Sequence, residues 1–459
     1  MTSEQYDVVV IGAGPAGEVL AGRLATAGLE VAIVEDRLVG GECSYWACMP
    51  SKALLRPAEA LAEVRRVPGA AEAVTGALDA QAALDRRDEV VHKLSDDAQL
   101  PWLEDQGITL VRGHGRLTSE RTVAVDGVVL EARTAVVVAT GSAPAIPPVR
   151  GLREAEPWTN REITVARHVP ERLTILGGGV VGCEMAQAWS TLGAQVTLVE
   201  PGDQLLGKEE PFAAEQVAAG LKELGVDLRM GAKAASVERP EPAGEVTLVL
   251  DDGARIVADE LLAATGRRPL TDDLGLETVG LEPGTYLETD EQLRSTSRAW
   301  LFVVGDANGR ALLTHMGKHQ ARIASDTILG RPARLYERGD GRQSPRVTFT
   351  SPQVAAVGLT LEAARQAGLP VRTVDVGTSA NAGGSFWGRN ATGTARIVVD
   401  TEREVIVGAT ITGAEVQDFL HAATIAVVGE VPLADLWHSI AAFPTRSELW
   451  LKLLEGYGL

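Results

Sequence analysis

The sequence predicts an α/β fold in which one strand–turn–helix–strand plan occurs twice before a C-terminal region of different character. Each copy opens with an apolar run, YDVVVIG or LTILGGG, continues with helical periodicity and ends in a second apolar strand. The landmarks, all displaced by 165 positions, are Gly12, Gly14, Gly17 and Glu35 in the first copy and Gly177, Gly179, Gly182 and Glu200 in the second. From about Arg346 the pattern changes to alternating strands and helices, which predicts an α+β domain.

The glycines and the acid of each copy have the spacing of a dinucleotide-binding turn. A lone G-x-G-x-x-G is equally compatible with an ordinary strand-to-helix turn. Here each motif follows a strand, opens a helix and has an acid 18 residues after its third glycine. Glycine permits a close backbone approach to pyrophosphate, and the acid accepts from a ribose hydroxyl. The sequence therefore predicts two Rossmann-like domains and two bound dinucleotides.

The first copy carries an insertion and is interrupted by the second. The acid and the closing alanine, Ala139 or Ala264, are 104 residues apart in the first copy and 64 in the second. Asp306, after a third apolar strand, is either a turn residue or part of the resumed first module. The predicted domains are a first module over 1–150 and 271–338, a second module over 151–270, and a C-terminal domain over 339–459.

Composition excludes some classes of function. The chain has 43 basic and 62 acidic residues, a formal charge of −19, so its average surface repels nucleic acid and anionic lipid. No apolar run reaches the roughly 18 residues that cross a bilayer, and the first residues do not form a basic-then-apolar leader. We therefore expect a cytoplasmic protein with neither nucleic acid nor membrane as a partner.

Two of the three cysteines, Cys43 and Cys48, lie in the short stretch GGECSYWACMPSK. In a reducing compartment such a pair is more often catalytic than structural, and the spacing does not suit zinc, so we expect no metal site. Five residues of ideal helix span about 7.5 Å, whereas disulfide-linked Cα atoms lie within about 7 Å. A bridge therefore needs a distorted turn, which we expect Pro50 to favour by moving Met49 out of helical geometry. The alternative is two buried thiols, which is the expectation for Cys183.

These motifs resemble those of the class I pyridine nucleotide-disulfide oxidoreductases, the family of glutathione reductase and lipoamide dehydrogenase. The resemblance covers essentially the whole chain. It also includes both ATG turns, GRRP from Gly266, VVGDA from Val303, FTSPQVAAVG from Phe349 and FPTRSE from Phe443. It implies that the first module binds FAD, that the second binds NADH or NADPH, and that the C-terminal domain forms a homodimer interface.

The resemblance also implies the residues of the two cofactor sites. FAD would be held by Gly12, Gly14, Gly17, Glu35, Lys52, Gly115, Thr140, Gly141, Asp306 and His315. The nicotinamide dinucleotide would be held by Gly177, Gly179, Gly182, Glu200 and Gly266. A carboxylate at the ribose position repels a 2′-phosphate, and no arginine follows in PGDQLLGKEE, so we expect NADH to be preferred over NADPH.

The redox roles follow from the same resemblance. Hydride would pass from the nicotinamide to the flavin and on to the disulfide, with Cys48 beside the flavin and Cys43 meeting the acceptor. Lys52 matches the lysine near the flavin, and Glu184 matches its carboxylate partner. A nearby cation would stabilise negative charge on the reduced ring. The alternative for this pair is a surface lysine and a helix-packing glutamate.

One position departs from the family pattern. The signature His-Pro-Thr is replaced by Phe443-Pro444-Thr445, so the imidazole that acts as acid and base toward the interchange thiol is missing. Glu448, which orients that imidazole in the family, is either catalytic or a solvated helix residue. Mercuric reductases and soluble transhydrogenases also do without this histidine. The former need a C-terminal cysteine pair, which is not found here, and the latter lack the paired cysteines.

The aromatic residues near these motifs have two interpretations. Tyr45, Trp46 and Phe443 either line a flat apolar pocket suited to quinones or pack at the loop and the dimer interface. We therefore predict an FAD-dependent NAD(P)H oxidoreductase that reduces a small disulfide or quinone-like acceptor through Cys43 and Cys48. The alternatives are a transhydrogenase-like or quinone-reducing enzyme that works directly from the flavin, and a slow redox-sensing flavoprotein.

Overall fold

The computed structural model describes residues 2–459, which form two compact units. Unit 1 comprises residues 2–50, Asp88–Pro144 and Arg267–Gly341, and unit 2 comprises Ser51–Arg87, Ala145–Gly266 and Arg342–Leu459. Each unit is therefore assembled from three stretches of the chain. The four predicted domain segments remain predictions.

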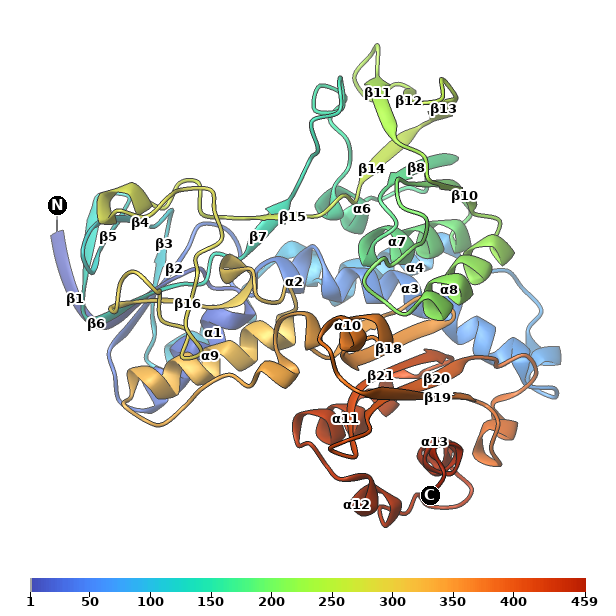
Figure 1. The fold of residues 1–459 in the computed structure, drawn as a ribbon. Helices are drawn as coiled ribbons and strands as arrows, with labels where there is room; N and C mark the ends of the chain where they lie inside the picture. Colours follow the sequence, from blue (N-terminus) through green and yellow to red (C-terminus); the bar gives the residue numbers. More distant parts are fainter. Residues whose placement is uncertain (1) are drawn as a thin grey trace. The chain divides into compact units, whose positions relative to one another are not determined.

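Unit 1 is built on a seven-stranded sheet in the order β3-β2-β1-β6-β5-β4, with β16 also paired to β6 (Figure 1). The strands are β1 (Thr2–Ile11), β2 (Val31–Glu35), β3 (Thr109–Arg112), β4 (Arg116–Ser119), β5 (Thr122–Val125), β6 (Val128–Val138) and β16 (Leu301–Val303). β1, β2, β3, β6 and β16 pair in parallel, whereas β4 and β5 are added through antiparallel pairs. A short antiparallel pair joins β7 (Ser142–Pro144) to β15 (Arg267–Pro269).

The apolar runs of unit 1 are continuous because both faces of the sheet are covered. Val8 and Val10 of β1 pack with residues of α1 (Pro15–Thr26) and α9 (Thr314–Ile328). Val9 of β1 belongs to the cluster on the other face. A strand buried on both sides needs apolar residues at every position rather than at alternate ones. The remaining helices of unit 1 are α2 (Gly41–Tyr45) and α5 (Leu100–Asp105).

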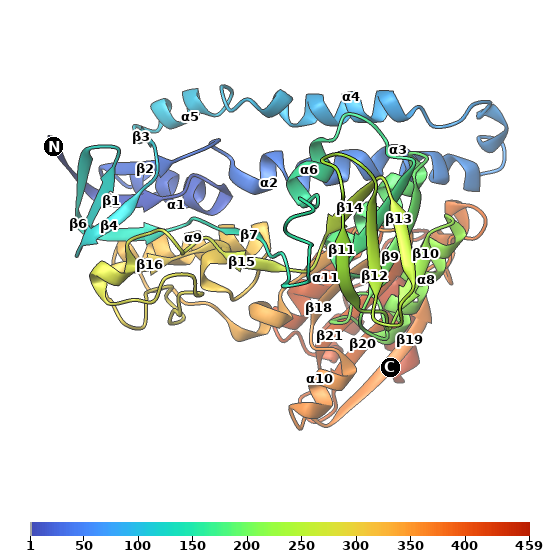
Figure 2. The same ribbon diagram turned by 90° about the horizontal axis from the view of Figure 1, so that it is seen from above.

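Unit 2 contains a parallel sheet in the order β10-β9-β8-β14 and a separate antiparallel sheet β11-β12-β13 (Figure 2). The strands are β8 (Arg172–Leu176), β9 (Gln195–Glu200), β10 (Asp227–Met230), β11 (Ala234–Glu238), β12 (Val246–Leu250), β13 (Arg255–Ala258) and β14 (Glu260–Ala263). The helices of this part are α6 (Asn160–Val165), α7 (Val180–Thr191) and α8 (Pro211–Glu223).

The core of unit 2 is centred on Trp189 of α7, which is fully buried. Its cluster includes Leu54 of α3 (Cys48–Arg66) and Leu84 of α4 (Ala80–Val90). The helix α3 begins in unit 1 and continues in unit 2. This helix therefore carries the residues after Cys48 into the core built around α7.

The C-terminal part of unit 2 is a five-stranded antiparallel sheet in the order β17-β18-β21-β20-β19. The strands are β17 (Arg346–Thr348), β18 (Gln353–Gly358), β19 (Val371–Gly377), β20 (Thr394–Asp400) and β21 (Val405–Gly413). The helices are α10 (Leu361–Gln366), α11 (Gln417–Val428), α12 (Leu433–Trp437) and α13 (Leu449–Tyr457). Residues of α11 and α13 share one apolar cluster with the sheet. No helix within residues 2–459 is long and apolar enough to span a bilayer.

The two predicted glycine turns have the same steric construction. Gly12 and Gly177 both have φ of +106°, and a Cβ on either would lie 2.5 Å from the carbonyl oxygen of the closing alanine, Ala139 or Ala264. The third glycine of each motif packs against the first, since a Cβ on Gly182 would lie 1.8 Å from the carbonyl oxygen of Gly177. Backbone atoms exclude a side chain at all four glycines, and the positive φ of Gly12 and Gly177 disfavours one at those two positions as well.

This construction predicts unequal effects of two alanine substitutions in the second turn. Gly182→Ala inserts a methyl group against backbone and should destabilise unit 2 by about 1–3 kcal/mol. Gly179→Ala is the matched control, because a Cβ there meets nothing within 4 Å. Thermal unfolding followed by circular dichroism measures the difference. Equal midpoints for the two variants would contradict the steric account.

Candidate functional site

The N-terminus of α1 is shaped to receive a phosphate group. Gly14 is the N-cap of this 12-residue helix and has no side chain to occupy the N–H groups of the first turn. Gly41 lies so close that a Cβ on it would be 2.7 Å from the Cα of Gly14. Backbone N–H groups at a helix start attract anions. This cradle fits the pyrophosphate of the dinucleotide that the glycine spacing predicts.

Glu35 closes the same turn from the end of β2. Its Oε2 accepts from the backbone N–H of Ala13 at 2.8 Å, and its Oε1 accepts from Arg37 at 2.9 Å. Burial raises the pKa of Glu35, and these two hydrogen bonds oppose the rise. Each carboxylate oxygen keeps a further lone pair, which suits a ribose hydroxyl.

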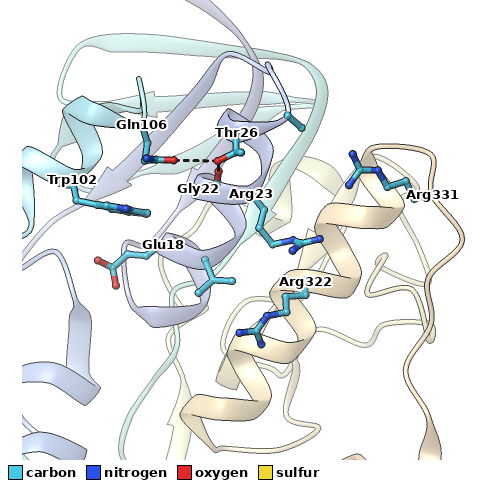
Figure 3. A pocket seen from close by; sticks show the side chains of 10 residues that line it. Glu18, Gly22, Arg23, Thr26, Trp102, Gln106, Arg322 and Arg331 are labelled. Atoms are coloured by element: carbon cyan, nitrogen blue, oxygen red, sulfur yellow. Dashed lines mark hydrogen bonds between the residues drawn. The ribbon is translucent and has the colours of Figure 1, made fainter.

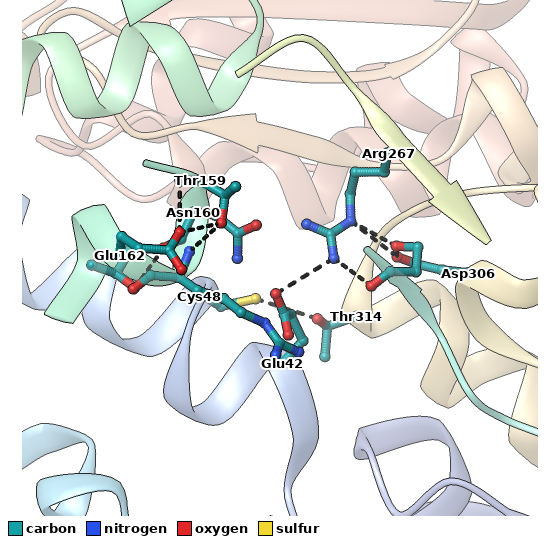
Figure 4. Close-up of polar contacts among 11 residues, drawn as sticks. Glu42, Cys48, Thr159, Asn160, Glu162, Arg267, Asp306 and Thr314 are labelled. Atoms are coloured by element: carbon teal, nitrogen blue, oxygen red, sulfur yellow. Dashed lines mark hydrogen bonds and ion pairs between the residues drawn. The ribbon is translucent and has the colours of Figure 1, made fainter. Parts of the chain in front are cut away.

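A polar cluster surrounds Asp306, which lies three residues after β16 in a short 3₁₀ helix (Figure 4). The Asp306 carboxylate accepts from Ser142 Oγ at 2.5 Å, and Arg267 Nε donates to the same Oγ at 2.6 Å. Arg267 Nη2 lies 3.7 Å from Glu42 Oε1, on the helix that carries Cys43. Burial raises the pKa of Asp306, whereas Ser142 and the Arg267 charge lower it. Arg267 therefore links the cysteine loop to the predicted ribityl-binding carboxylate.

The turn after β6 has an unsatisfied polar atom. Thr140 Oγ1 is buried and has no hydrogen-bond partner among residues 2–459. Gly141 beside it has φ of +74°, and a Cβ there would meet nothing within 4 Å. Buried hydroxyls almost always have a partner. An unpartnered hydroxyl next to open space fits a bound polar group, as the resemblance implies for both residues.

The cysteine loop contains the distorted turn that a disulfide needs, but in a different place from the one predicted. Cys43 lies in α2 and Cys48 is the first residue of α3, with the helix interrupted at Trp46 and Ala47. The prediction that Pro50 moves Met49 out of helical geometry is wrong, because Met49 is helical. Pro50 is tolerated in the first turn of α3, where its missing N–H would have had no intrahelical partner.

The two sulfurs are hydrogen-bonded to each other and lie at the N-terminal turn of α9. Cys48 Sγ is 3.3 Å from Thr314 Oγ1. The hydrogen bond to Cys48 and then burial raise the pKa of Cys43, while Thr314 and the charge of Lys318 lower it. Both cysteines are thiols in this structure. Cys183 is fully buried, as predicted, and burial raises its pKa.

Lys52 and Glu184 are brought together in unit 2. Lys52 Nζ lies 2.7 Å from Glu184 Oε2, and Glu184 Oε1 accepts from the backbone N–H of Phe349 at 2.9 Å. The ammonium also lies 4.7 Å from the centre of the Phe349 ring. The Glu184 side chain is 3% exposed, whereas that of Lys52 is 36% exposed. The buried Glu184 carboxylate is therefore fixed in position, and it orients the ammonium of Lys52. Lys52 lies on α3 one helical turn after Cys48.

The second glycine turn repeats the polar contacts of the first. Glu200 Oε2 accepts from Gly178 at 2.6 Å and its Oε1 accepts from Gly202 at 2.7 Å. Gly179 is the N-cap of α7 and faces open space. Gly266, at the closing turn, also faces open space and has φ of +123°. These features fit a second dinucleotide, with the N-terminus of α7 toward its pyrophosphate.

The C-terminal signature is largely exposed. Phe443 is 77% exposed, and Glu448 follows it in a short 3₁₀ helix. One carboxylate oxygen of Glu448 is buried and has no partner among residues 2–459. Tyr45, which the sequence places either in an apolar pocket or in packing of the loop, is packed inside the protein. It is 1% exposed, and its hydroxyl donates to the backbone carbonyl of Val39 at 3.0 Å.

Two further predicted residues lie in unit 1. Gly115 is buried, and a Cβ on it would lie 3.1 Å from Val34 and 3.2 Å from Ile11. His315 is exposed in the first turn of α9, next to Thr314. All predicted cofactor and redox roles remain predictions.

Four polar residues in the same surroundings were not predicted: Glu42, Ser142, Arg267 and Thr314. Each lies inside or beside a motif that the sequence identified. They lie in the stretches GGEC, ATGS, GRRP and LLTH, respectively, and this closeness to the motifs could have identified them as candidate site residues. The contacts among them join segments far apart in the chain, so spacing alone does not reveal them.

Comparison with known proteins gives a consistent result. Residues 6–323 match the family described as "Pyridine nucleotide-disulphide oxidoreductase", and residues 344–453 match its dimerisation domain. The chain is 33% identical to dihydrolipoyl dehydrogenase of Thermus scotoductus over 98% of this chain and 97% of the relative. It is 30% identical to mercuric reductase of Lysinibacillus sphaericus over 98% of this chain and 82% of the relative.

Two solved structures share the fold. LpdA from Mycobacterium tuberculosis superposes with a TM-score of 0.86 at 26% identity and covers 100% of both chains. The HOCl-induced flavoprotein disulfide reductase RclA from Escherichia coli superposes with a TM-score of 0.85 at 25% identity over 98% of this chain and 99% of RclA. The α/β fold with cofactor-binding domains and a C-terminal dimerisation domain is thereby confirmed. The chain belongs to the pyridine nucleotide-disulphide oxidoreductase family, whose members are FAD flavoproteins that use NAD(P)H.

Proposed function

We propose that this protein oxidises NADH and delivers the electrons through the Cys43–Cys48 pair to a small disulfide or quinone-like acceptor. The observation that carries the proposal is the position of the two sulfurs, hydrogen-bonded to each other and to the N-terminal turn of α9. When bound, FAD supplies two-electron chemistry between a nicotinamide and a dithiol. A cytoplasmic location and a homodimer are parts of the same proposal.

The residues of the chain would hold and orient the reactants. Gly14 and Glu35 would bind the pyrophosphate and a ribose of FAD, and Asp306 would accept from its ribityl hydroxyls. The break at Trp46 and Ala47 allows Cys43 and Cys48 to approach each other. Reduction would place two protons and two electrons on the sulfurs, and the acceptor would take them with reformation of the S–S bond.

Lys52 is proposed to supply a fixed positive charge beside the electron-accepting ring. The buried Glu184 holds its ammonium at 2.7 Å, and the backbone of Phe349 holds Glu184 in turn. A preorganised cation stabilises charge that develops during reduction without a reorganisation cost. Phe443 offers no imidazole for the Glu448 carboxylate to orient.

A homodimer is supported by exposed apolar side chains in the matched dimerisation domain. Ile440 is 90% exposed, Phe443 is 77% exposed and Ile425 is 56% exposed. Contiguous exposed apolar patches commonly mark an interaction surface. The proposal places them at the contact between two copies.

Serine substitutions test whether the sulfur pair lies on the electron route. We expect Cys43→Ser and Cys48→Ser to lower NADH-dependent reduction of both lipoamide and menadione by more than about 100-fold, since removal of a nucleophilic or redox group has effects of this order. Cys183→Ala, which leaves the pair intact, is the control. Steady-state rates with each acceptor measure the effect. Wild-type menadione turnover in both serine variants would instead favour direct transfer from the flavin.

The nucleotide preference rests on Glu200. Its carboxylate at the ribose position repels a 2′-phosphate, so kcat/KM should be at least about tenfold higher with NADH than with NADPH. Glu200→Gln keeps the side-chain length and removes the charge, so the ratio should fall mainly through better use of NADPH. Steady-state kinetics with both nucleotides measure the ratio, and a wild-type preference for NADPH would refute this assignment.

A further inference from the structure

The outer face of α1 in unit 1 forms a groove that the predicted cofactor sites do not use. The groove has a volume of about 490 Å³ and is lined by residues of α1, of α5 and of α9 with the segment that follows it (Figure 3). A cavity of this size falls within the usual range of small-molecule sites. None of its lining residues is among the predicted cofactor-binding or redox residues. The groove is therefore a candidate for a further ligand.

The floor of the groove is a single helix face with little side-chain bulk. The lining residues of α1 occupy positions 18, 19, 22, 23, 26 and 27, which is the spacing of one face of a helix. Gly22 lies in the middle of this face, and a Cβ on it would be 2.9 Å from the indole of Trp102. The face extends over nine residue steps, or about 13 Å of helix. The groove is thus longer than a single aromatic ring with an attached acid group.

The α5 side of the groove offers an aromatic surface and an amide. Trp102 is 38% exposed although it packs on Gly22. Thr26 Oγ1 lies 2.7 Å from the carbonyl oxygen of Gly22 and 3.1 Å from Gln106 Oε1 (Figure 3). This contact orients the Gln106 amide and leaves its NH₂ group without a partner among residues 2–459. Aromatic side chains of this kind bind planar rings by stacking.

The opposite side of the groove carries three guanidinium groups and one acid. Asp326 is shared by two of them, at 2.8 Å from Arg23 Nη2 and 3.3 Å from Arg331 Nη1. The buried Nε of Arg23 has no hydrogen-bond partner in the described part of the chain. Arg322 is exposed and makes no hydrogen bond or ion pair within residues 2–459. This side is therefore positively charged in a chain whose formal charge is −19, which favours an anion.

Glu18 is the acid that lines the groove itself. In Figure 3 its carboxylate points away from Arg23 and Arg322. Burial raises the pKa of Glu18 to about 7, although the charge of Lys318 lowers it, and Glu35 raises it further. Near pH 7 this carboxyl group is therefore partly neutral, so its repulsion of an anion beside the arginines is weakened.

We propose that this groove binds a nucleoside phosphate, with the base on the Trp102 indole and the phosphate at the guanidinium groups of Arg322 and Arg331. Arginine pairs with phosphate through two parallel hydrogen bonds, and Arg322 has all of its donors available. The Gln106 amide would donate to an acceptor on the edge of the base. A planar ring by itself would use only the α5 side, and a free phosphate only the arginines. The length of the groove suits a ligand that reaches both.

Isothermal titration calorimetry of the holoenzyme with AMP tests this proposal, with saturating NAD⁺ present to occupy the second glycine turn. We expect one AMP per subunit. Arg322→Met and Trp102→Leu should each weaken binding by at least about tenfold, since each removes a charged hydrogen bond or a stacking surface. Arg365→Met, which changes an exposed arginine on α10, is the matched control and should bind AMP like the wild type. Bound flavin shows that each variant is folded.

Titrations with parts of AMP show whether both ends of the groove are used. Adenosine lacks the phosphate and ribose 5-phosphate lacks the base, so each should bind at least about tenfold more weakly than AMP. Equal AMP affinity in the wild type, Arg322→Met and Trp102→Leu would overturn the proposal. It would also be overturned if inorganic phosphate bound as tightly as AMP, or if no saturable AMP binding occurred below about 1 mM.

Discussion

The contact between the cysteine pair and the N-terminal turn of α9 is the interaction on which the functional account depends. Thr314 lies 3.3 Å from Cys48 Sγ although the two residues are 266 positions apart in the chain. The parallel sheet of unit 1 makes this contact possible, because β16 pairs with β6 and returns the chain to the side of α1. Without that return, the cysteine loop would lack the Thr314 hydroxyl beside Cys48.

The same fold positions the acids that distinguish the two turns from ordinary strand–helix connections. Glu35 and Glu200 each accept from one backbone N–H group in the glycine turn and from one two residues further along their own loop. These bonds fix the carboxylates before any ligand arrives, which reduces the ordering cost of binding. Arg267 extends the arrangement by connecting Ser142 and Asp306 to the helix of Cys43.

The sequence was informative where local sterics decide the structure. The positive φ of Gly12 and Gly177 and their contacts with Ala139 and Ala264 follow from the motif itself, and so the paired turns could be predicted. The helix break at Trp46 and Ala47 could not, because a proline suggested a different position and the favourable geometry of a first helical turn overrode it.

Contacts between distant segments were the main features that the sequence did not reveal. The hydroxyl beside Cys48 comes from Thr314 of α9, which belongs to no chemical motif on its own. Tyr45 could equally have faced a pocket, and only packing places its hydroxyl on Val39. Such choices depend on tertiary packing rather than on local residue pattern.

The central claim is that electrons from NADH come to rest on two sulfurs as well as on the flavin. Anaerobic titration of the holoenzyme with NADH, followed by absorbance, tests it most directly. The account predicts uptake of about four electrons per FAD, two on the flavin and two on Cys43 and Cys48. Uptake of only about two electrons, unchanged in Cys48→Ser, would contradict it.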